Sequence, residues 1–182
     1  GKAGIETNVL WSHAVGQSTE AAKQALADDT TTIVIAGGDG GDYLYGDAGD
    51  DQILGGTGED DIEGGLGDDN IFGGDGHDQI DGGAGDDRID GGNDYDQIHG
   101  GTGNDTLDGG DGSDSLYGDV GDDQIVGGTG CDYITGGDGN DTIDGQGAED
   151  TLAGNEGVDV LNGSTSEINE NFSFYASWVD SV

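Results

Sequence analysis

The sequence predicts an all-β fold, a parallel β-solenoid in which two nonapeptides form each coil. Three observations lead to this expectation. A nine-residue pattern recurs fourteen times, without insertion or deletion, from Gly37 to Asn162. Its first position is always Gly, its sixth is always Asp, and its eighth is always Ile or Leu. A period this strict indicates a repeat architecture in which each unit packs against its neighbours.

Composition argues against a conventional globular core. Hydrophobic residues make up 30% of the 182-residue chain, whereas Gly alone contributes 42 residues. The formal net charge is −38, and residues 37–162 hold 34 of the 41 acidic residues but a single base, Arg88. Such a chain repels itself unless cations neutralise it. Nucleic acids and anionic membranes need a basic footprint and are disfavoured, so the expected partner is a cation.

Residues 1–36 are expected to form an N-terminal flank and cap. A helix is predicted at about 19–28, because Ser18 or Thr19 can cap it and Ala and Leu follow at helical spacing. The β-branched stretch 31–36 predicts a strand that leads directly into the first nonapeptide. We expect this segment to cover the end of the solenoid rather than to carry a site.

Within each nonapeptide, the first six residues are expected to turn and the last three to form a very short strand. Gly at positions one, two and four tolerates positive φ. Position eight points to one side of the strand, and positions seven and nine point to the other. Aromatic residues fit this alternation, because five of them occupy position seven or nine: Tyr43, Tyr45, Phe72, Tyr117 and Tyr133.

Strands of three residues need neighbours, so strands 18 residues apart are expected to stack in parallel at about 4.8 Å. The fourteen copies then give about seven coils around a thin double layer of Ile and Leu. The pattern degrades in the last two copies, as terminal repeats commonly do. The segment 163–182 is expected to cap the open sheet edge; the open alternative is that it belongs to an export signal or a neighbouring domain.

The chemistry of the repeat points to calcium. Ca²⁺ takes six to eight hard oxygen ligands from carboxylates and backbone carbonyls. The Asp at position six supplies the carboxylate, and the glycine turns expose carbonyls. An ion between copy n and copy n+2 can take an Asp from each, which allows up to about twelve ions and a net charge near −14. Mg²⁺ fits less well because it retains water. Zn²⁺ fits poorly because the three histidines, His13, His77 and His99, are isolated and Cys131 stands alone in a loop.

Acidic residues at positions three, five and nine occur irregularly, so we expect them to form a solvated surface. The Asp at position six never varies, which favours a ligand role there.

The pattern GGxGxDxUx, with U apolar, resembles the RTX (repeats-in-toxin, haemolysin-type) calcium-binding nonapeptide. Its clearest copies read GGTGNDTLD at 100–108 and GGDGNDTID at 136–144, and the resemblance covers 126 of 182 residues. It implies a parallel β-roll with Ca²⁺ held between turns by the Asp at position six and by carbonyls of positions two and four. It also implies secretion from a Gram-negative bacterium through a type I channel, to an extracellular or cell-surface location, with folding triggered by Ca²⁺ outside the cell.

Carried onto this sequence, the resemblance assigns two sets of candidate metal ligands. The carboxylates are Asp42, Asp51, Asp60, Asp69, Asp78, Asp87, Asp96, Asp105, Asp114, Asp123, Asp132, Asp141, Asp150 and Asp159. The backbone carbonyls are those of Gly56, Gly58, Gly65, Gly67, Gly74, Gly76, Gly83, Gly85, Gly101, Gly103, Gly110, Gly112, Gly128, Gly130, Gly137 and Gly139. Asp94, in place of Gly at position four, and Gln146 with Ala148 in the thirteenth copy, are expected to perturb their loops.

The expected function is a calcium-binding module that is unfolded where Ca²⁺ is scarce and folded where it is abundant. No GxSxG, HExxH or Ser/His/Asp set is present, so we do not expect this chain to be an enzyme. Because the sequence lacks Met, we expect it to be part of a larger protein, with neighbouring domains as partners. Two parents stay open: a surface adhesin or surface-layer protein, and a secreted lipase, protease or toxin that uses the repeat for folding and export.

No stretch approaches the roughly 18 apolar residues of a membrane helix, and the oligomeric state is open.

Overall fold

The computed structural model describes residues 8–11 and 32–163. The predicted helix at 19–28 and nearly all of the segment 163–182 lie outside these residues. The described part of the chain is all-β and contains no helix. Its strands are β1 (Asn8–Trp11), β2 (Ile33–Asp39), β3 (Tyr43–Tyr45), β4 (Gln52–Thr57), β5 (Asp61–Leu66), β6 (Asn70–Asp75), β7 (Gln79–Ala84), β8 (Arg88–Asn93), β9 (Gln97–Thr102), β10 (Thr106–Asp111), β11 (Ser115–Val120), β12 (Gln124–Thr129), β13 (Tyr133–Asp138), β14 (Thr142–Gln146), β15 (Thr151–Glu156) and β16 (Val160–Asn162).

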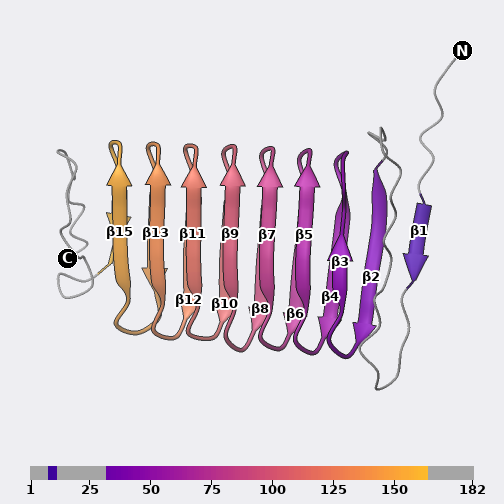
Figure 1. Cartoon of the computed structure of the whole chain (residues 1–182). Coiled ribbons are helices and arrows are strands. Elements are labelled where there is room, and N and C mark those ends of the chain that lie inside the picture. Colours follow the sequence, from indigo (N-terminus) through magenta and orange to yellow (C-terminus); the bar gives the residue numbers. More distant parts are fainter. Residues whose placement is uncertain (1–7, 12–31, 164–182) are drawn as a thin grey trace, which may run out of the picture.

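Successive strands of the repeat alternate between two parallel sheets, which lie one behind the other in Figure 1. The nine-stranded sheet has the order β1-β2-β4-β6-β8-β10-β12-β14-β16, and the seven-stranded sheet has the order β15-β13-β11-β9-β7-β5-β3. From β2 onward, neighbours within a sheet are 18 residues apart, so that Ile53 pairs with Ile71 and Leu107 with Ile125. Two nonapeptides therefore make one coil, and the predicted β-solenoid of about seven coils is confirmed.

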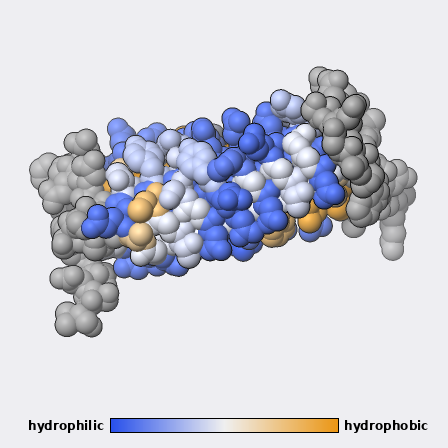
Figure 2. Space-filling view, turned by 90° about the horizontal axis from the view of Figure 1, so that it is seen from below, coloured by the Kyte–Doolittle hydropathy of each residue, from blue (hydrophilic) through white to orange (hydrophobic). Residues whose placement is uncertain are grey.

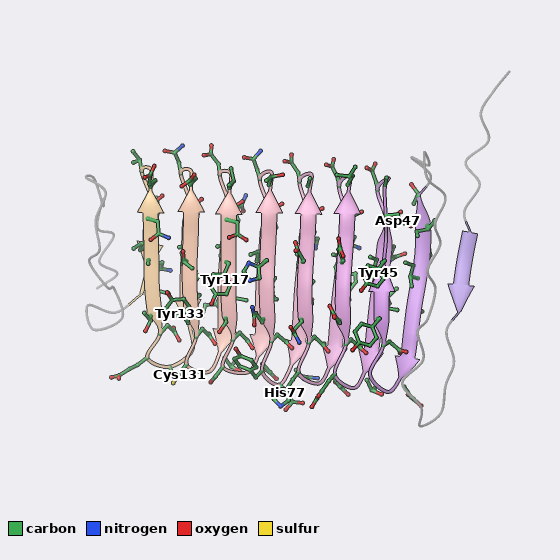
Figure 3. The ribbon with its side chains drawn as sticks, viewed as in Figure 1. Tyr45, Asp47, His77, Tyr117, Cys131 and Tyr133 are labelled. Atoms are coloured by element: carbon green, nitrogen blue, oxygen red, sulfur yellow. The ribbon has the colours of Figure 1, made fainter. Side chains whose placement is uncertain are left out.

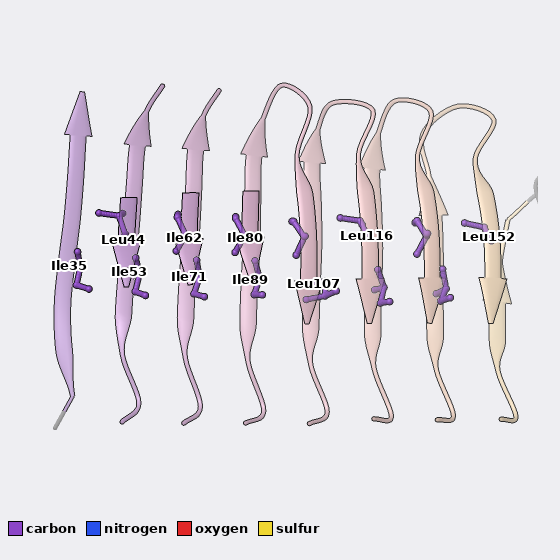
Figure 4. Close-up of a cluster of buried hydrophobic side chains, with 14 of the residues drawn as sticks. Ile35, Leu44, Ile53, Ile62, Ile71, Ile80, Ile89, Leu107, Leu116 and Leu152 are labelled. Atoms are coloured by element: carbon purple, nitrogen blue, oxygen red, sulfur yellow. The ribbon is translucent and has the colours of Figure 1, made fainter. Parts of the chain in front are cut away.

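The core is a ladder of Ile and Leu side chains between the two sheets (Figure 4). Position eight supplies every rung from Leu44 to Leu152, and each of these side chains is at most 2% exposed. Leu161, in the last copy, is partly buried against the ladder, and Ile33 and Ile35 of β2 extend it before the repeat begins. Because each coil adds only two such side chains, the hydrophobic layer is thin along the whole roll.

The strands are longer than the predicted three residues. A typical strand such as β4 has six residues, positions seven to nine of one nonapeptide and one to three of the next. The glycines at positions one and two therefore belong to the strand and continue its pairing with the next strand, as Gly56 does with Gly74. Two glycines carry no side-chain signal for a strand, which is why the pattern alone predicted a turn there. The turn is reduced to positions four to six.

Positive φ is retained where Asp, Asn or Gln146 (58°) replaces a glycine at position two or four, but not at Ala148 in the thirteenth copy. The values are 73° for Asp47, 75° for Asp94, 71° for Asp119 and 73° for Asn155, and Asp and Asn are the residues that best tolerate this region. Asp94 itself keeps a left-handed backbone, whereas Gly112, which stacks on it in the next coil, lacks the positive φ of the other position-four glycines. The thirteenth copy does differ, since β14 ends after five residues at Gln146.

Position five forms a hydrogen-bonded ladder along one edge of the roll. The Oδ1 atom of each member accepts the backbone N–H of position five in the next coil, at 2.8–3.1 Å. The members are Asp50, Asp68, Asp86, Asn104, Asp122 and Asn140. These side chains are exposed, as predicted, but they also link the coils. The turn face seen in Figure 2 is predominantly hydrophilic, with small apolar spots.

Candidate metal centre

The aspartates at position six point into the roll rather than into solvent. From Asp42 to Asp150, each is at most 4% exposed. Asp159, in the last copy, is half-buried. Buried carboxylates are rare unless they are paired, because desolvation of the charge is costly. Two rows of buried acids, one along each edge of the roll, therefore require a compensating partner.

From Asp51 to Asp159, one oxygen of each carboxylate accepts a backbone N–H from the preceding coil. Oδ1 of Asp60 accepts the backbone N–H of Asp42 at 2.8 Å, and Oδ1 of Asp105 accepts that of Asp87 at 2.8 Å. The same bond recurs along both rows, up to Asp141 N–H to Asp159 Oδ1 at 3.1 Å. Each Asp thus satisfies a backbone donor of the preceding coil.

The other carboxylate oxygen is buried and has no hydrogen-bond partner in the central copies. This holds for Oδ2 of Asp60, Asp69, Asp78, Asp87, Asp96, Asp105, Asp114, Asp123, Asp132 and Asp141. Native proteins rarely leave such atoms unsatisfied without an ion, water or functional reason. The orphaned oxygens fit a hard cation, which prefers carboxylate oxygen.

The glycine at position one borders this oxygen. A Cβ placed on Gly55 would lie 2.5 Å from Asp60 Oδ2 and 2.5 Å from the carbonyl oxygen of Gly73. A carboxylate oxygen of one coil and a carbonyl oxygen of the next therefore face the same small space. Position one is not among the predicted site residues, although its Gly is invariant in all fourteen copies.

Gly73→Ala is expected to weaken calcium binding and to lower the stability of the calcium-loaded roll by about 2 kcal/mol. Its Cβ would lie 2.5 Å from both Asp78 Oδ2 and the Gly91 carbonyl oxygen, so it would occupy the space between them. The Ca²⁺ midpoint of the circular dichroism signal measures the effect. Thr102→Ala, at an exposed position three, is the control. Equal midpoints for the two variants would contradict a role for position one.

The predicted carbonyl set lies in stacked turns at the two edges of the roll. All of these glycines except Gly112 have φ between 96° and 152°. A Cβ on Gly58 would lie 2.7 Å from the carbonyl oxygen of Gly40, so the stacked loops leave no space for side chains. Gly112 lies 18 residues after Asp94 and stacks on it. Its φ is not positive, so the backbone of this loop differs from that of the other loops.

Burial raises the pKa of the carboxyl groups at position six. For Asp69 it raises the pKa to about 7; the Asp51 N–H opposes the shift, and neighbouring carboxylates add to it. Burial raises the pKa of Asp96 furthest, to about 8, with contributions from Asp78, Asp114 and Asp94. The pKa is about 7 for Asp87 and Asp123 and about 6 for Asp60, Asp105, Asp114 and Asp141. Without a cation, the folded state therefore favours the protonated form of these carboxyl groups near neutral pH.

Acid is expected to stabilise the calcium-free roll. The folded pKa values lie above the ordinary value of 3.8, so the folded state binds protons more tightly than the unfolded chain. This stabilisation is fully present below the unfolded value of 3.8 and is lost as pH rises through 6 to 8. β-sheet circular dichroism in EDTA should therefore increase on acidification. A signal independent of pH would contradict the burial of these carboxyls.

Side chains alone do not make a metal site here. Among residues 8–11 and 32–163, no group of three or more His, Cys, Asp or Glu is arranged to hold a metal ion. His99 Nδ1 lies 2.9 Å from Asp119 Oδ2, and His77 Nδ1 lies 3.0 Å from the carbonyl oxygen of Tyr95. An ion at position six would therefore need further oxygen ligands, and the stacked turns offer backbone carbonyls there.

Comparison with known proteins identifies the repeat. The family model for the RTX calcium-binding nonapeptide repeat matches residues 34–62, 63–98, 91–125, 99–133 and 126–161, which together exceed half of the chain. A search of curated proteins gave no significant match. No helix in the described residues is long and apolar enough to cross a membrane. RTX repeats are structural calcium-binding units rather than catalytic ones. The chain therefore belongs to the RTX calcium-binding nonapeptide repeat family, and its β-roll is a Ca²⁺-binding module.

Proposed function

We propose that the roll of residues 37–162 is a folding switch that forms when it binds Ca²⁺ outside the cell. The flanks 1–36 and 163–182 would serve as caps at its two ends. The observation that carries this proposal is the row of buried Oδ2 atoms without partners, in a chain of net charge −38. From Asp60 to Asp141, no ion pair with a Lys or Arg of the described residues offsets the charge of these carboxylates.

Four positions of the nonapeptide have distinct roles in this proposal. Oδ1 of the Asp at position six fixes the preceding coil, and Oδ2 stays available for a cation. Carbonyls of positions two and four, with the space kept open at position one, complete an oxygen-rich site between coils. Bound Ca²⁺ would supply the charge that offsets the buried carboxylates. Up to about twelve such sites, six along each edge, fit the fourteen copies.

Equilibrium dialysis against Ca²⁺ tests the proposal directly. We expect more than one ion per coil, with affinities of about 10⁻⁴–10⁻³ M, as in other extracellular modules. Mg²⁺ at the same concentration is the control and should bind much more weakly. Binding of one ion or none per chain would overturn the assignment of position six as the ligand.

The parent protein we favour is a large surface adhesin or surface-layer protein exported by type I secretion. RTX repeats are typical of secreted proteins, and the fourteen copies form an uninterrupted block without a catalytic motif. A secreted lipase, protease or toxin that carries the roll as a folding and export module is the second candidate. The sequence of the full precursor distinguishes the two, because an enzyme or toxin would add a catalytic or pore-forming domain.

A further inference from the structure

The outward face of the seven-stranded sheet differs in chemistry from the opposite face. Its aromatic rings and carboxylates are not position-six residues, so the proposed Ca²⁺ sites do not use them. No Lys or Arg is among the outward residues of β3 to β15, whereas Arg88 lies on β8 of the other sheet. This face therefore stays negative after Ca²⁺ has bound inside the roll.

A hollow of about 230 Å³ lies on this face across β5, β7 and β9. Besides Ile62 and Ile80, its lining consists of three carboxylates, two amides and an imidazole: Asp61, Glu63, Asp81, Gln79, Gln97 and His99. The hollow is thus rich in hydrogen-bond acceptors and lacks a cationic side chain of its own. Charge complementarity favours a positively charged occupant.

His99, which is stacked on Tyr117, forms one wall of the hollow. His99 and Tyr117 pair across β9 and β11, with ring centroids 4.4 Å apart and planes 6° apart. Because that separation is close to the strand spacing, the rings stand upright on the sheet and face along the roll axis. The remaining face of His99 is directed toward β7, where its register partner Asp81 lines the hollow.

Hydrogen bonds hold the His99 ring in this orientation. Its Nδ1 lies 2.9 Å from Asp119 Oδ2, and its Nε2 lies 3.3 Å from Gln97 Nε2. Tyr133 continues the aromatic row beyond Tyr117, with centroids 6.0 Å apart, and is 46% exposed. Figure 3 shows Tyr117 and Tyr133 close together on this sheet. The wall is therefore fixed before any partner arrives.

We propose that this face docks an arginine-bearing segment of a partner protein. A guanidinium group in the hollow would stack its plane on His99 and donate paired hydrogen bonds to the carboxylate of Asp81, while Glu63 on the next strand adds negative charge. Flanking apolar groups of the segment would lie against Tyr117 and Tyr133, since exposed Tyr is favoured in binding surfaces. A sugar fits less well, because the upright His99 and Tyr117 rings cover one another and present their edges outward.

Fluorescence anisotropy with a labelled octapeptide that holds two Arg residues among Gly and Ser tests this docking. The full chain is used in saturating Ca²⁺. Asp81→Asn and His99→Ala are each expected to weaken binding about tenfold. Replacing Arg by Lys in the peptide should also weaken binding, because an ammonium group cannot stack or bond in the same plane.

Matched variants on the nine-stranded sheet separate docking from general electrostatic attraction. Asp108→Asn removes the same charge as Asp81→Asn, and Phe72→Ala removes a ring as His99→Ala does. Both should leave the affinity unchanged. Equal losses on the two faces would overturn the proposal, as would binding of a neutral oligosaccharide, but not the peptide, at this face.

The docking proposal rests on the proposed function only in that the roll must be folded in Ca²⁺. Circular dichroism on Ca²⁺ addition reports folding independently of any peptide. A roll that folds but does not bind the peptide contradicts the docking alone. A chain that does not respond to Ca²⁺ contradicts the proposed function.

Discussion

In excess EDTA at neutral pH, the chain is expected to lose its β-sheet circular dichroism, and about millimolar Ca²⁺ is expected to restore it. The reason lies in the balance of forces within one coil. Each coil buries two apolar side chains, such as Ile53 and Ile62, but also two carboxylates at position six. The apolar contribution is about 2–3 kcal/mol per side chain. Burial of carboxylates without a counter-charge costs at least a comparable amount.

High salt is the control for this prediction. At about 1 M monovalent salt the Debye length falls to about 3 Å, so repulsion between exposed carboxylates is largely screened. The buried Oδ2 atoms are not reached by this screening, because they are enclosed between coils. Salt alone should therefore leave the EDTA-treated chain unfolded. Refolding in high salt without Ca²⁺, or full β content in EDTA, would show that the buried carboxylates do not control folding.

The sequence was sufficient to predict the coil and the core. A fixed nine-residue period with Ile or Leu at position eight allows one stacking register, and the structure has it, with Leu107 paired to Ile125. The candidate carboxylates were also recognisable, because position six never varies. What they ligate is still a prediction, although their burial is now established from Asp42 to Asp150.

Features that depend on three-dimensional contacts were not predictable. The strand extension through Gly55 and Gly56 has no side-chain signal, because only backbone hydrogen bonds to the next coil define it. The ladder at position five has a mixture of Asp and Asn, which looks irregular until residues 18 apart, such as Asp86 and Asn104, are placed in contact. The hollow beside His99 combines residues from three copies of the repeat, so no single nonapeptide contains it.

Asp105→Ala is expected to have the largest effect of any single substitution in the middle of the roll. Asp105 is 1% exposed, and its Oδ1 atom accepts the buried N–H of Asp87 at 2.8 Å. Its loss leaves that N–H without an acceptor, which costs about 1–3 kcal/mol. It also removes a carboxylate from the two proposed sites shared with Asp87 and Asp123. We expect about two fewer bound ions and protease cleavage at the central coils, because each coil is stabilised only by its neighbours.

Two companion variants separate the hydrogen bond from the ion. Asp105→Asn keeps an Oδ1 acceptor for the Asp87 N–H but removes the charge, so it should recover part of the stability and none of the lost ions. Asp108→Ala, three residues away on the outward side of β10, removes the same charge but leaves every position-six carboxylate in place. It should retain both the stability and the number of bound ions. Equilibrium dialysis gives the ion count and Ca²⁺ titration gives the stability. If Asp105→Asn bound as many ions as the unaltered chain, the carboxylate at position six would not be the ligand.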